Sequence, residues 1–342
     1  ETGTTDRTAD FKAGVGATLT FEYIVQAGDL STNLDYASAN ALVLNGGTIH
    51  DLAGNAAVLT LSNPGTAGSL GANKAIVIDT TVPKIESVDI PTAGSYKAGT
   101  TLTFTVNTDE PIVVNTTGGN PRIGLAIGST EKYAEFEPTG STATKLNFVY
   151  TVVSGDEDAD GVELASSVEL NGGTIQDAAG NDLELSFDGV DTNGILVDTV
   201  APNVTGVSVP PNATYVTGQT LEFIVAMNEP VIVTGEPTLG LIIGGVSRSA
   251  QYIDSVSDSE LKFGYTVTSG DFDNDGINLT AMSLPGGAGI TDTAGNTAVL
   301  TLNNVADTSG VLVDAVQPQV TGVSVPAAGT YTLGESLTFT VH

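Results

Sequence analysis

An internal repeat constrains the fold of this chain more than any other feature of its sequence. The stretches "VIDTTVPKIESVDIP", "LVDTVAPNVTGVSVP" and "LVDAVQPQVTGVSVP" match, and their aspartates Asp79, Asp198 and Asp314 lie 119 and 116 residues apart. A second set, "TLTFEYIVQAGD", "KLNFVYTVVSGD" and "ELKFGYTVTSGD", matches in the same order. Such a period is too long for one solenoid turn and suits one independently folded domain per repeat.

The matches divide the chain into four parts. We predict that residues 1–79 are the C-terminal part of a repeat, here called the leading part, and that residues 80–198 and 199–314 are complete repeats, called the first and second whole repeats. Residues 315–342, the trailing part, are predicted to be the N-terminal strands of a further repeat. Because the pattern begins and stops inside a repeat, we expect the chain to be an excerpt of a longer polypeptide.

Apolar residues within a repeat alternate with period two, as in Leu102, Phe104 and Val106. This spacing is typical of strands that bury one face. Clusters of Gly, Pro, Asn and Thr separate the alternating runs, and no segment keeps a period of 3.6 residues. About seven short strands in about 115 residues predict an all-β fold of tandem immunoglobulin-like antiparallel β-sandwich domains. A closed barrel is the alternative, but it does not require a proline at each repeat boundary.

Each boundary carries a proline four residues after its aspartate, at Pro83, Pro202 and Pro318. Proline fixes its own φ and holds the preceding residue extended. The last strand of one repeat therefore leads into the next repeat with little slack. We expect the domains to form an extended, stiff rod.

The charge of the chain limits its partners. It has 40 acidic and 10 basic residues and a formal net charge of −30, so we expect it to repel nucleic acid and anionic lipid surfaces. This charge suits either recruitment of divalent cations or adaptation to a salty medium. The chain has no cysteine, so disulfides do not hold it together. It has no run of about 18 apolar residues, which argues against membrane insertion in this segment.

The loop that begins with Gly-Asp indicates cation binding. Its three copies read "GDLSTNLD" from Gly28, "GDEDADGV" from Gly155 and "GDFDNDGI" from Gly270. The second and third copies have the pattern D-x-D-x-D-G, whose alternating carboxylates can turn inward to supply part of the about six to eight oxygen ligands of Ca²⁺. The first copy keeps an aspartate and offers Ser31 and Asn33 as weaker donors. A solvated acidic turn is the alternative interpretation.

Down-up alternation of the strands brings this loop beside the boundary aspartate of its own repeat and the Asx-Glu-Pro stretch of the next. We predict three Ca²⁺ sites on this basis. Their ligands would be Asp29, Asn33, Asp79 and Glu110 in the first, Asp156, Asp158, Asp160, Asp198 and Glu229 in the second, and Asp271, Asp273, Asp275 and Asp314 in the third. Crowded carboxylates repel one another without a cation, so a divalent ion would clamp neighbouring repeats. Alternatively, these carboxylates cap separate turns.

The D-x-x-G-N stretches at Asp51–Asn55, Asp177–Asn181 and Asp292–Asn296 are predicted to be structural turns. Asp caps a turn through the nearby backbone, and Gly-Asn suits left-handed conformations. The two histidines, His50 and His342, do not occupy equivalent positions, and no catalytic set recurs between the repeats. We therefore expect no enzymatic activity.

Three features together resemble the tandem immunoglobulin-like (cadherin-like) repeats of giant calcium-dependent bacterial surface adhesins. They are the Asp-Thr-x-x-Pro boundary, the Asx-Glu-Pro stretches at Asp109–Ile112 and Asn228–Val231, and the D-x-x-G-N turn. The resemblance covers nearly the whole chain. It implies an extracellular extender at the cell surface, with Ca²⁺ stiffening the junctions between neighbouring repeats, and with other copies or surface ligands bound by distal modules. The first Gly-Asp loop departs from the aspartate pattern of the other two.

Two other functions remain open from the sequence. A module that binds sugar or protein would use loops that differ between repeats, and the loops at Ser62–Lys74, Asp188–Gly194 and Asn303–Gly310 do differ in length. A self-assembling filament or sheath subunit would fill an incomplete sandwich at one end with strands from a neighbouring copy.

Overall fold

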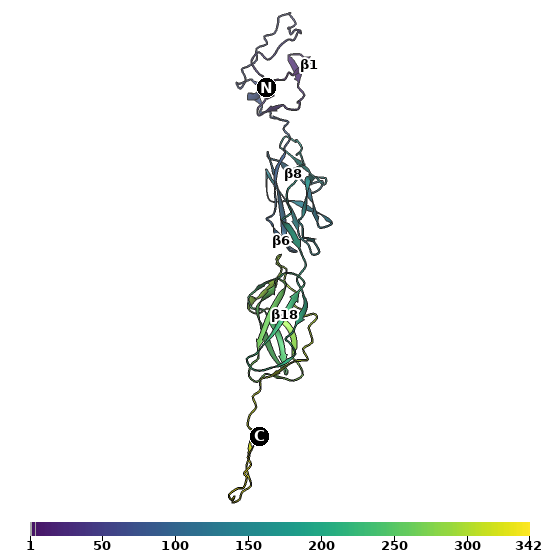
Figure 1. Cartoon of the computed structure of the whole chain (residues 1–342). Helices are drawn as coiled ribbons and strands as arrows, with labels where there is room; N and C mark the ends of the chain where they lie inside the picture. The colour runs from purple at the N-terminus through teal and green to yellow at the C-terminus, as the bar shows by residue number, and fades with distance from the viewer. Residues whose placement is uncertain (1, 4) are drawn as a thin grey trace. The chain divides into compact units, whose positions relative to one another are not determined.

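A computed structural model describes residues 2, 3 and 5–342 of the chain. Strands hold 44% of the residues and helices 2%, which confirms the prediction of an all-β fold. The chain divides into two compact units, and Figure 1 draws its strands as arrows. Unit 1 comprises Glu1–Ala93, Gly99–Val152 and Asp158–Leu196, and unit 2 comprises Gly94–Ala98, Val153–Glu157 and Val197–His342. In the described part of the chain, no helix has the length and apolar composition needed to cross a membrane.

The second whole repeat lies in unit 2. Its strands are β16 (Val204–Ser208), β17 (Ala213–Tyr215), β18 (Thr220–Met227), β19 (Ile232–Thr234), β20 (Thr238–Ile243), β21 (Val246–Ser257), β22 (Glu260–Thr266), β23 (Phe272–Asp273), β24 (Asn278–Ser283), β25 (Gly289–Thr291) and β26 (Val311–Asp314), with a short 3-10 turn at Pro285–Gly287. The largest sheet has the order β16-β18-β22-β21-β20-β24, and its neighbours are antiparallel. A second sheet has the order β17-β26-β23, and β19 pairs with β25.

Alternating burial builds the core of unit 2. In β18 the side chains of Leu221, Phe223 and Val225 are fully buried, whereas the residues between them are exposed or half-buried. They belong to one cluster of buried residues that also contains Val311 and Val313 of β26. Burying an apolar side chain of this size contributes about 1.5–3 kcal/mol. The six-stranded sheet and the sheet of β26 thus share one apolar core, an arrangement compatible with a β-sandwich.

A parallel pairing of two strands departs from the predicted antiparallel arrangement. β17 runs parallel to β26, with Ala213 opposite Val311. Between β16 and β17 the chain passes Pro210 and Pro211, which lack the backbone N–H that a sheet ladder needs. The first strand of the repeat is therefore interrupted and divided between the two sheets.

Unit 1 contains the same succession of strands in the first whole repeat. They are β5 (Ile85–Asp89), β7 (Thr101–Thr108), β8 (Val113–Asn115), β9 (Arg122–Ile127), β10 (Thr130–Thr142), β11 (Lys145–Thr151), β13 (Glu163–Glu169) and β14 (Thr174–Gln176). The six-stranded sheet has the order β13-β9-β10-β11-β7-β5, and β14 pairs with β8. Three further strands carry residues that belong wholly or partly to unit 2: β6 (Gly94–Tyr96), β12 (Glu157–Asp158) and β15 (Ile195–Asp198). Leu102, Phe104 and Val106 are fully buried, as their alternation predicts.

An aromatic pair recurs across the same antiparallel hairpin in each copy. In the leading part the hairpin joins β1 (Asp10–Val15) to β2 (Thr18–Glu22). The pairs are Phe11–Phe21, Phe136–Phe148 and Tyr252–Phe263, each edge-to-face with ring centroids 5.9 Å apart. Such a pair contributes about 0.5–1.5 kcal/mol beyond its buried area. The second set of matching sequences therefore folds into one recurring local structure.

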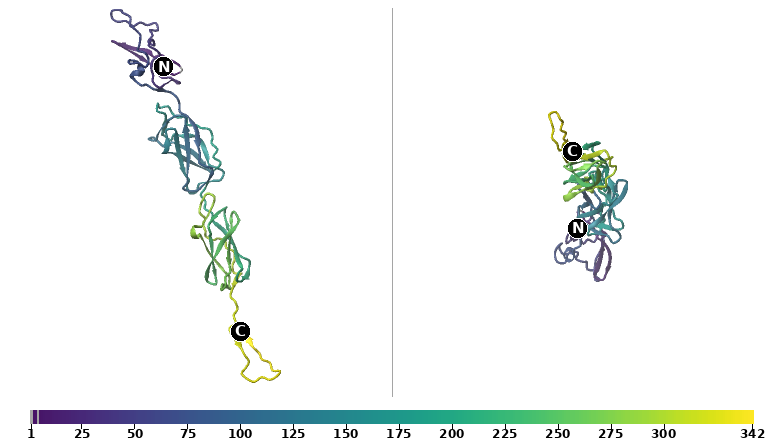
Figure 2. Two further views of the ribbon diagram at one scale, coloured as in Figure 1. Left: turned by 90° about the vertical axis from the view of Figure 1, so that its left-hand side faces the viewer. Right: turned by 90° about the horizontal axis from the view of Figure 1, so that it is seen from below.

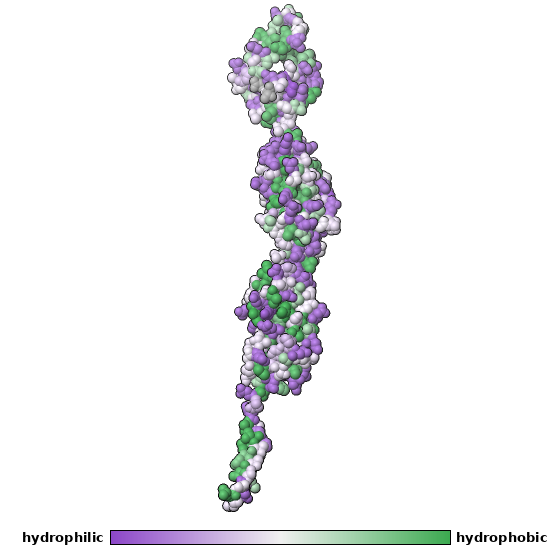
Figure 3. Space-filling model, viewed as in Figure 1, coloured by the Kyte–Doolittle hydropathy of each residue, from purple (hydrophilic) through white to green (hydrophobic). Residues whose placement is uncertain are grey.

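The leading and trailing parts expose apolar residues that the whole repeats bury. Besides β1 and β2, the leading part contains β3 (Leu30–Ser31), β4 (Ile78–Asp79) and the one-turn helix α1 (Leu70–Asn73). Phe21 of β2 is 40% exposed, whereas the equivalent Phe263 is fully buried. The trailing part pairs β27 (Val323–Ser324) with β28 (Thr340–Val341) and is drawn in yellow in Figure 2. From Val316 onward its large apolar side chains are exposed (Figure 3).

Candidate metal centres

Two groups of three carboxylates lie at consecutive repeat boundaries, each within a single unit. The first triad is Asp79, Glu110 and Asp177 in unit 1, and the second triad is Asp198, Glu229 and Asp292 in unit 2. In each triad, one carboxylate oxygen from every residue lies within 4.8 Å of the other two. The two triads use equivalent positions of the repeat, so one local design occurs twice.

The boundary aspartate of each triad is the last residue of a strand, with Asp79 ending β4 and Asp198 ending β15. Its Oδ1 accepts a hydrogen bond from the backbone N–H two residues later, at 2.9 Å from Thr81 and 3.0 Å from Val200. An aspartate that bonds the backbone two residues on closes a local turn. This bond fixes the orientation of the carboxylate while using one of its two oxygens.

The glutamate of each triad follows an Asx residue that ties down the start of the same repeat. The backbone N–H of Lys84 donates to Asp109 Oδ1 at 2.7 Å, and that of Asn203 donates to Asn228 Oδ1 at 2.6 Å. A carboxylate and an amide oxygen both accept this bond, so Asp and Asn serve equally well here. Proline follows each glutamate and holds the glutamate backbone extended. The Asx-Glu-Pro stretch thus combines a side chain that binds the start of the repeat, an acidic side chain, and a proline that keeps the backbone extended.

Glu110 brings an unsatisfied oxygen to the first triad. Its Oε1 is buried and has no hydrogen-bond partner among the described residues. Buried polar atoms in native proteins are normally hydrogen-bonded, and an orphaned one requires an explanation such as an ion. A cation held by the first triad would satisfy this oxygen.

The third carboxylate of each triad comes from the D-x-x-G-N turn. Asp177 Oδ1 accepts hydrogen bonds from the backbone N–H groups of Ala179, Gly180 and Asn181 at 2.7–2.9 Å. Its Oδ2 accepts one from Asn181 Nδ2 at 2.7 Å. Asp292 makes the equivalent bonds with Asn296, at 2.8 Å to the backbone N–H and 2.8 Å to Nδ2. The turn therefore surrounds a buried aspartate with hydrogen-bond donors.

Burial and nearby negative charges raise the pKa of three triad carboxylates, those of Glu110, Asp198 and Glu229. Burial raises the pKa of Glu110, and the nearby charges of Asp79, Asp177 and Asp109 raise it further. Burial also raises the pKa of Asp198 and of Glu229, and the charge of Asp292 adds to both shifts. These directions are those expected when like charges are held together without a compensating cation.

The donor set fits a hard divalent cation. Each triad offers only carboxylate oxygens, which suit Mg²⁺, Ca²⁺ and Mn²⁺ better than the softer metals that prefer thiolate or imidazole. Three carboxylates supply fewer than the about six to eight ligands that Ca²⁺ takes, so backbone oxygens or water would complete the shell. A bound divalent cation would offset the repulsion that raises the pKa values of Glu110, Asp198 and Glu229.

The structure brings together four of the residues predicted to bind Ca²⁺. It places Asp79 with Glu110, and Asp198 with Glu229, in one triad each. It also places the Gly-Asp loop beside the boundary, where strand alternation predicts it. The N–H of Gly28 donates to Thr80 Oγ1 at 3.0 Å, and that of Gly155 donates to Thr199 Oγ1 at 2.9 Å.

The first aspartates of the three loops nevertheless face their own loop. Each accepts a hydrogen bond through Oδ2 from the backbone N–H three residues earlier: Asp29 from Gln26 at 2.8 Å, Asp156 from Val153 at 2.9 Å and Asp271 from Thr268 at 2.8 Å. All three aspartates are buried. Each of these side chains therefore caps its own turn, as the alternative interpretation of the sequence has it.

Asp271 shows how completely such a carboxylate is satisfied. Arg248 donates to its Oδ1 at 2.7 and 2.9 Å, and Tyr265 donates to its Oδ2 at 2.6 Å. Burial works against ionisation, but bonds from Tyr265, Thr268 and Arg248 outweigh it and lower the pKa of Asp271 to about 2. Asp29 has an equivalent pair of partners, Arg7 and Tyr23.

The second aspartates of the D-x-D-x-D-G loops hold two chain segments together. Asp158 accepts from the N–H groups of Gly128 and Gly161, both at 2.7 Å, and Asp273 accepts from those of Gly244 and Gly276 at 2.6 and 2.9 Å. The glycine that ends the pattern is required by its backbone. Gly161 has φ +114°, and a Cβ there would lie 2.4 Å from Asn193 Cα. The acidic pattern thus closes a tight loop.

The remaining predicted ligands are exposed. Asp160, Asp275 and Asp314 face solvent, and Asp314 Oδ1 accepts from the N–H of Val316 at 3.2 Å. Asn33 donates to the carbonyl of Gly71 at 3.3 Å.

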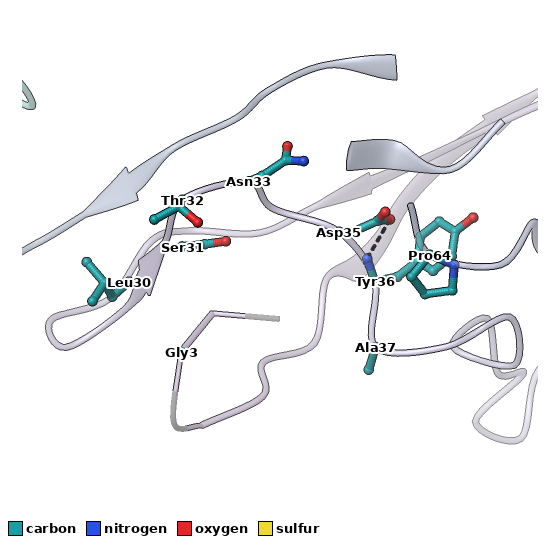
Figure 4. A pocket seen from close by; sticks show the side chains of 9 residues that line it. All are labelled: Gly3, Leu30, Ser31, Thr32, Asn33, Asp35, Tyr36, Ala37 and Pro64. Atoms are coloured by element: carbon teal, nitrogen blue, oxygen red, sulfur yellow. Dashed lines mark hydrogen bonds between the residues drawn. The ribbon is translucent and has the colours of Figure 1, made fainter. Parts of the chain in front are cut away.

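Asn33 lines a cavity of about 400 Å³ in the leading part, together with Leu30, Asp35, Tyr36 and Pro64 (Figure 4). The Asp35 carboxylate there accepts from the N–H groups of Tyr36 and Gly65 at 2.9 and 3.0 Å. The acidic group of this cavity is therefore satisfied by its own backbone. None of the described residues that line this cavity belongs to either triad.

The prediction of a purely structural D-x-x-G-N turn left out two members of the triads, Asp177 and Asp292. Their turn hydrogen bonds agree with that prediction, but the same carboxylates also face the boundary aspartate. The sequence signal for this role is recurrence, because the turn accompanies both Asx-Glu-Pro stretches at an equivalent place in the repeat.

No protein-family model matches the chain, and no curated protein matches it.

Proposed function

We propose that this chain is a structural extender: a tandem of immunoglobulin-like repeats from a large extracellular bacterial surface protein, whose triads bind Ca²⁺ and stiffen the repeat junctions. The recurrence of the same triad at two consecutive boundaries carries the proposal. In each triad one carboxylate ends a repeat and the other two belong to the next. A cation held by all three would resist bending at that junction.

Calcium is favoured over the other hard cations by the shape of the donor set. Mg²⁺ requires near-ideal octahedral geometry and gives up its water reluctantly, whereas Ca²⁺ tolerates irregular arrangements with several carboxylates. The triads contain neither histidine nor cysteine, the ligands that favour zinc. Extracellular media supply calcium at concentrations that match sites of modest affinity.

Calorimetric titration and thermal melting test the proposal. We expect two Ca²⁺ ions per chain and a melting temperature that rises in calcium relative to chelator. The stabilisation of a junction is about 2.7 kcal/mol at a free calcium concentration one hundred times Kd. Magnesium at the same concentration should give a much smaller rise. A chain that takes up no calcium, and melts identically in calcium and chelator, would refute the proposal.

A matched pair of variants locates the sites. Asp198→Asn should remove one of the two sites, whereas Asp314→Asn should remove none, since Asp314 makes the same local turn bond outside the triads. Small-angle X-ray scattering in calcium and in chelator then tests stiffness. Wild type should become more flexible in chelator, and Asp198→Asn in calcium should lie between these two states, because its first triad still binds calcium.

A further inference from the structure

An asparagine joins two of the three residues in each triad. Asn181 Nδ2 donates to Asp177 Oδ2 at 2.7 Å and to the backbone carbonyl of Asp79 at 3.2 Å, 102 residues away in the sequence. Asn296 Nδ2 makes the same two contacts, with Asp292 Oδ2 at 2.8 Å and the carbonyl of Asp198 at 2.9 Å. One amide group therefore uses both of its hydrogens to link a turn of one repeat to the last residue of the preceding repeat.

The leading part contains the same turn, but among the described residues its asparagine makes no second contact of this kind. Asn55 Nδ2 donates to Asp51 Oδ2 at 2.7 Å, and the N–H of Asn55 donates to Asp51 Oδ1 at 2.8 Å. Asp51 is exposed and belongs to neither triad. The bond within the turn is thus independent of the bond to the boundary residue, and the chain provides a natural comparison between them.

We propose that Asn181 and Asn296 are positioning residues of the cation sites, and that their bond to the boundary carbonyl holds the boundary aspartate at the distance from the turn that a shared cation requires. This inference rests on the proposed function. Two ligands on different repeats must otherwise be brought together when the cation arrives, which costs affinity. The amide bond brings them together beforehand.

The chemistry of the amide explains why asparagine occupies this position. Its two N–H donors bind a carboxylate and a carbonyl without adding charge to a crowded acidic site. An aspartate of the same size would lose both donations and add a further negative charge beside Asp177 or Asp292. Residues that orient metal ligands in this way typically change metal affinity by about 10- to 100-fold when replaced.

Calcium titration of the full chain tests the inference with three alanine variants. Asn296→Ala should weaken binding at one of the two sites by about tenfold or more and leave the other unchanged, and Asn181→Ala should do the same at the other site. Asn55→Ala loses the equivalent turn bond alone and should leave both affinities unchanged. Melting in chelator shows whether each variant is folded before titration.

The isosteric variant Asn296→Asp separates positioning from ligand supply. We expect it to bind calcium more weakly than wild type, because both N–H donations are lost. Tighter binding would mean that charge alone governs the site and would overturn the inference, as would unchanged affinity in Asn181→Ala and Asn296→Ala. Failure of wild type to bind calcium would refute the proposed function and, with it, the inference.

Discussion

Replacing Glu229 by Gln is expected to shift stability in opposite directions with and without calcium. Without a cation, Glu229 is a half-buried carboxylate that burial and the charges of Asp198 and Asp292 drive toward protonation. Its neutral isostere removes that repulsion. With calcium present, the same change removes a charged ligand, and calcium affinity depends on the charge count of the site.

The size of the effect without calcium follows from the spacing of the triad. Two unit charges within 4.8 Å of one another repel by about 3.5 kcal/mol at an effective dielectric constant near 20. Solvent screening of half-buried groups reduces this to about 1 kcal/mol. We therefore expect Glu229→Gln to raise the free energy of unfolding in chelator by about 1 kcal/mol. At a calcium concentration that saturates the site, a tenfold or greater loss of affinity would lower the stabilisation by calcium by about 1.4 kcal/mol or more.

Urea denaturation in chelator and in calcium measures both effects. Glu236→Gln is the matched control, since Glu236 also precedes a proline but is exposed and lies outside the triads. In chelator the raised folded-state pKa of Glu229 adds a pH signature. Protonation favours the folded state, so wild-type stability rises relative to the variant as pH falls through the raised pKa toward 4.5. Destabilisation by Glu229→Gln in chelator, or equal calcium dependence in variant and wild type, would refute the reasoning.

Three further substitutions test the loops and the core. Asp271→Asn should lower the free energy of unfolding by about 2 kcal/mol at neutral pH, because folding lowers the pKa of Asp271 from 3.8 to about 2. Urea denaturation should show the difference between variant and wild type decreasing as the pH falls from about 4 to about 2. Phe263→Ala should cost about 3–5 kcal/mol because the ring is fully buried, whereas Phe272→Ala, 48% exposed, should cost less than about 1 kcal/mol. Gly161→Ala should lower the free energy of unfolding by more than about 1 kcal/mol, because the φ of Gly161 is +114° and a Cβ there is crowded. Gly189→Ala is the control, because its Cβ would meet open space, and it should leave the urea denaturation curve unchanged.

The sheet structure follows closely from the sequence because strand periodicity reports burial directly. Leu102, Phe104 and Val106 alternate in the sequence and are buried together. The parallel pairing of β17 with β26 could not be predicted in the same way. Alternation within a strand says which face is buried, whereas the partner of a three-residue strand depends on where the chain goes after Pro210 and Pro211.

The candidate site was only partly predictable, for a related reason. Asp79 and Glu110 were placed together from the order of the strands, which sets the end of the domain that each loop occupies. The sequence predicts only a structural turn at Asp177, and that turn accounts for the carboxylate locally, with three backbone donors and Asn181 around it. A residue that satisfies a local rule gives no local signal of a second role, and only the recurrence of the turn with each Asx-Glu-Pro stretch indicates one.

Hydrogen-bond donors separate the two kinds of acidic cluster in this chain. Asp271 accepts from Arg248, Tyr265 and Thr268, so its charge is matched inside the loop and its pKa falls. At the boundary the pKa of Glu110 rises, and its buried Oε1 lacks a donor in the described chain. A polypeptide can neutralise a carboxylate with its own N–H groups, which fixes a loop, or leave the carboxylate to a cation. Aspartates are most frequent in the D-x-D-x-D-G loops, where hydrogen-bond donors are plentiful. The frequency of aspartate in the sequence therefore indicates these loops. Glu110 Oε1, which lacks a donor among the described residues, lies where one repeat meets the next, and there a cation would act on the junction.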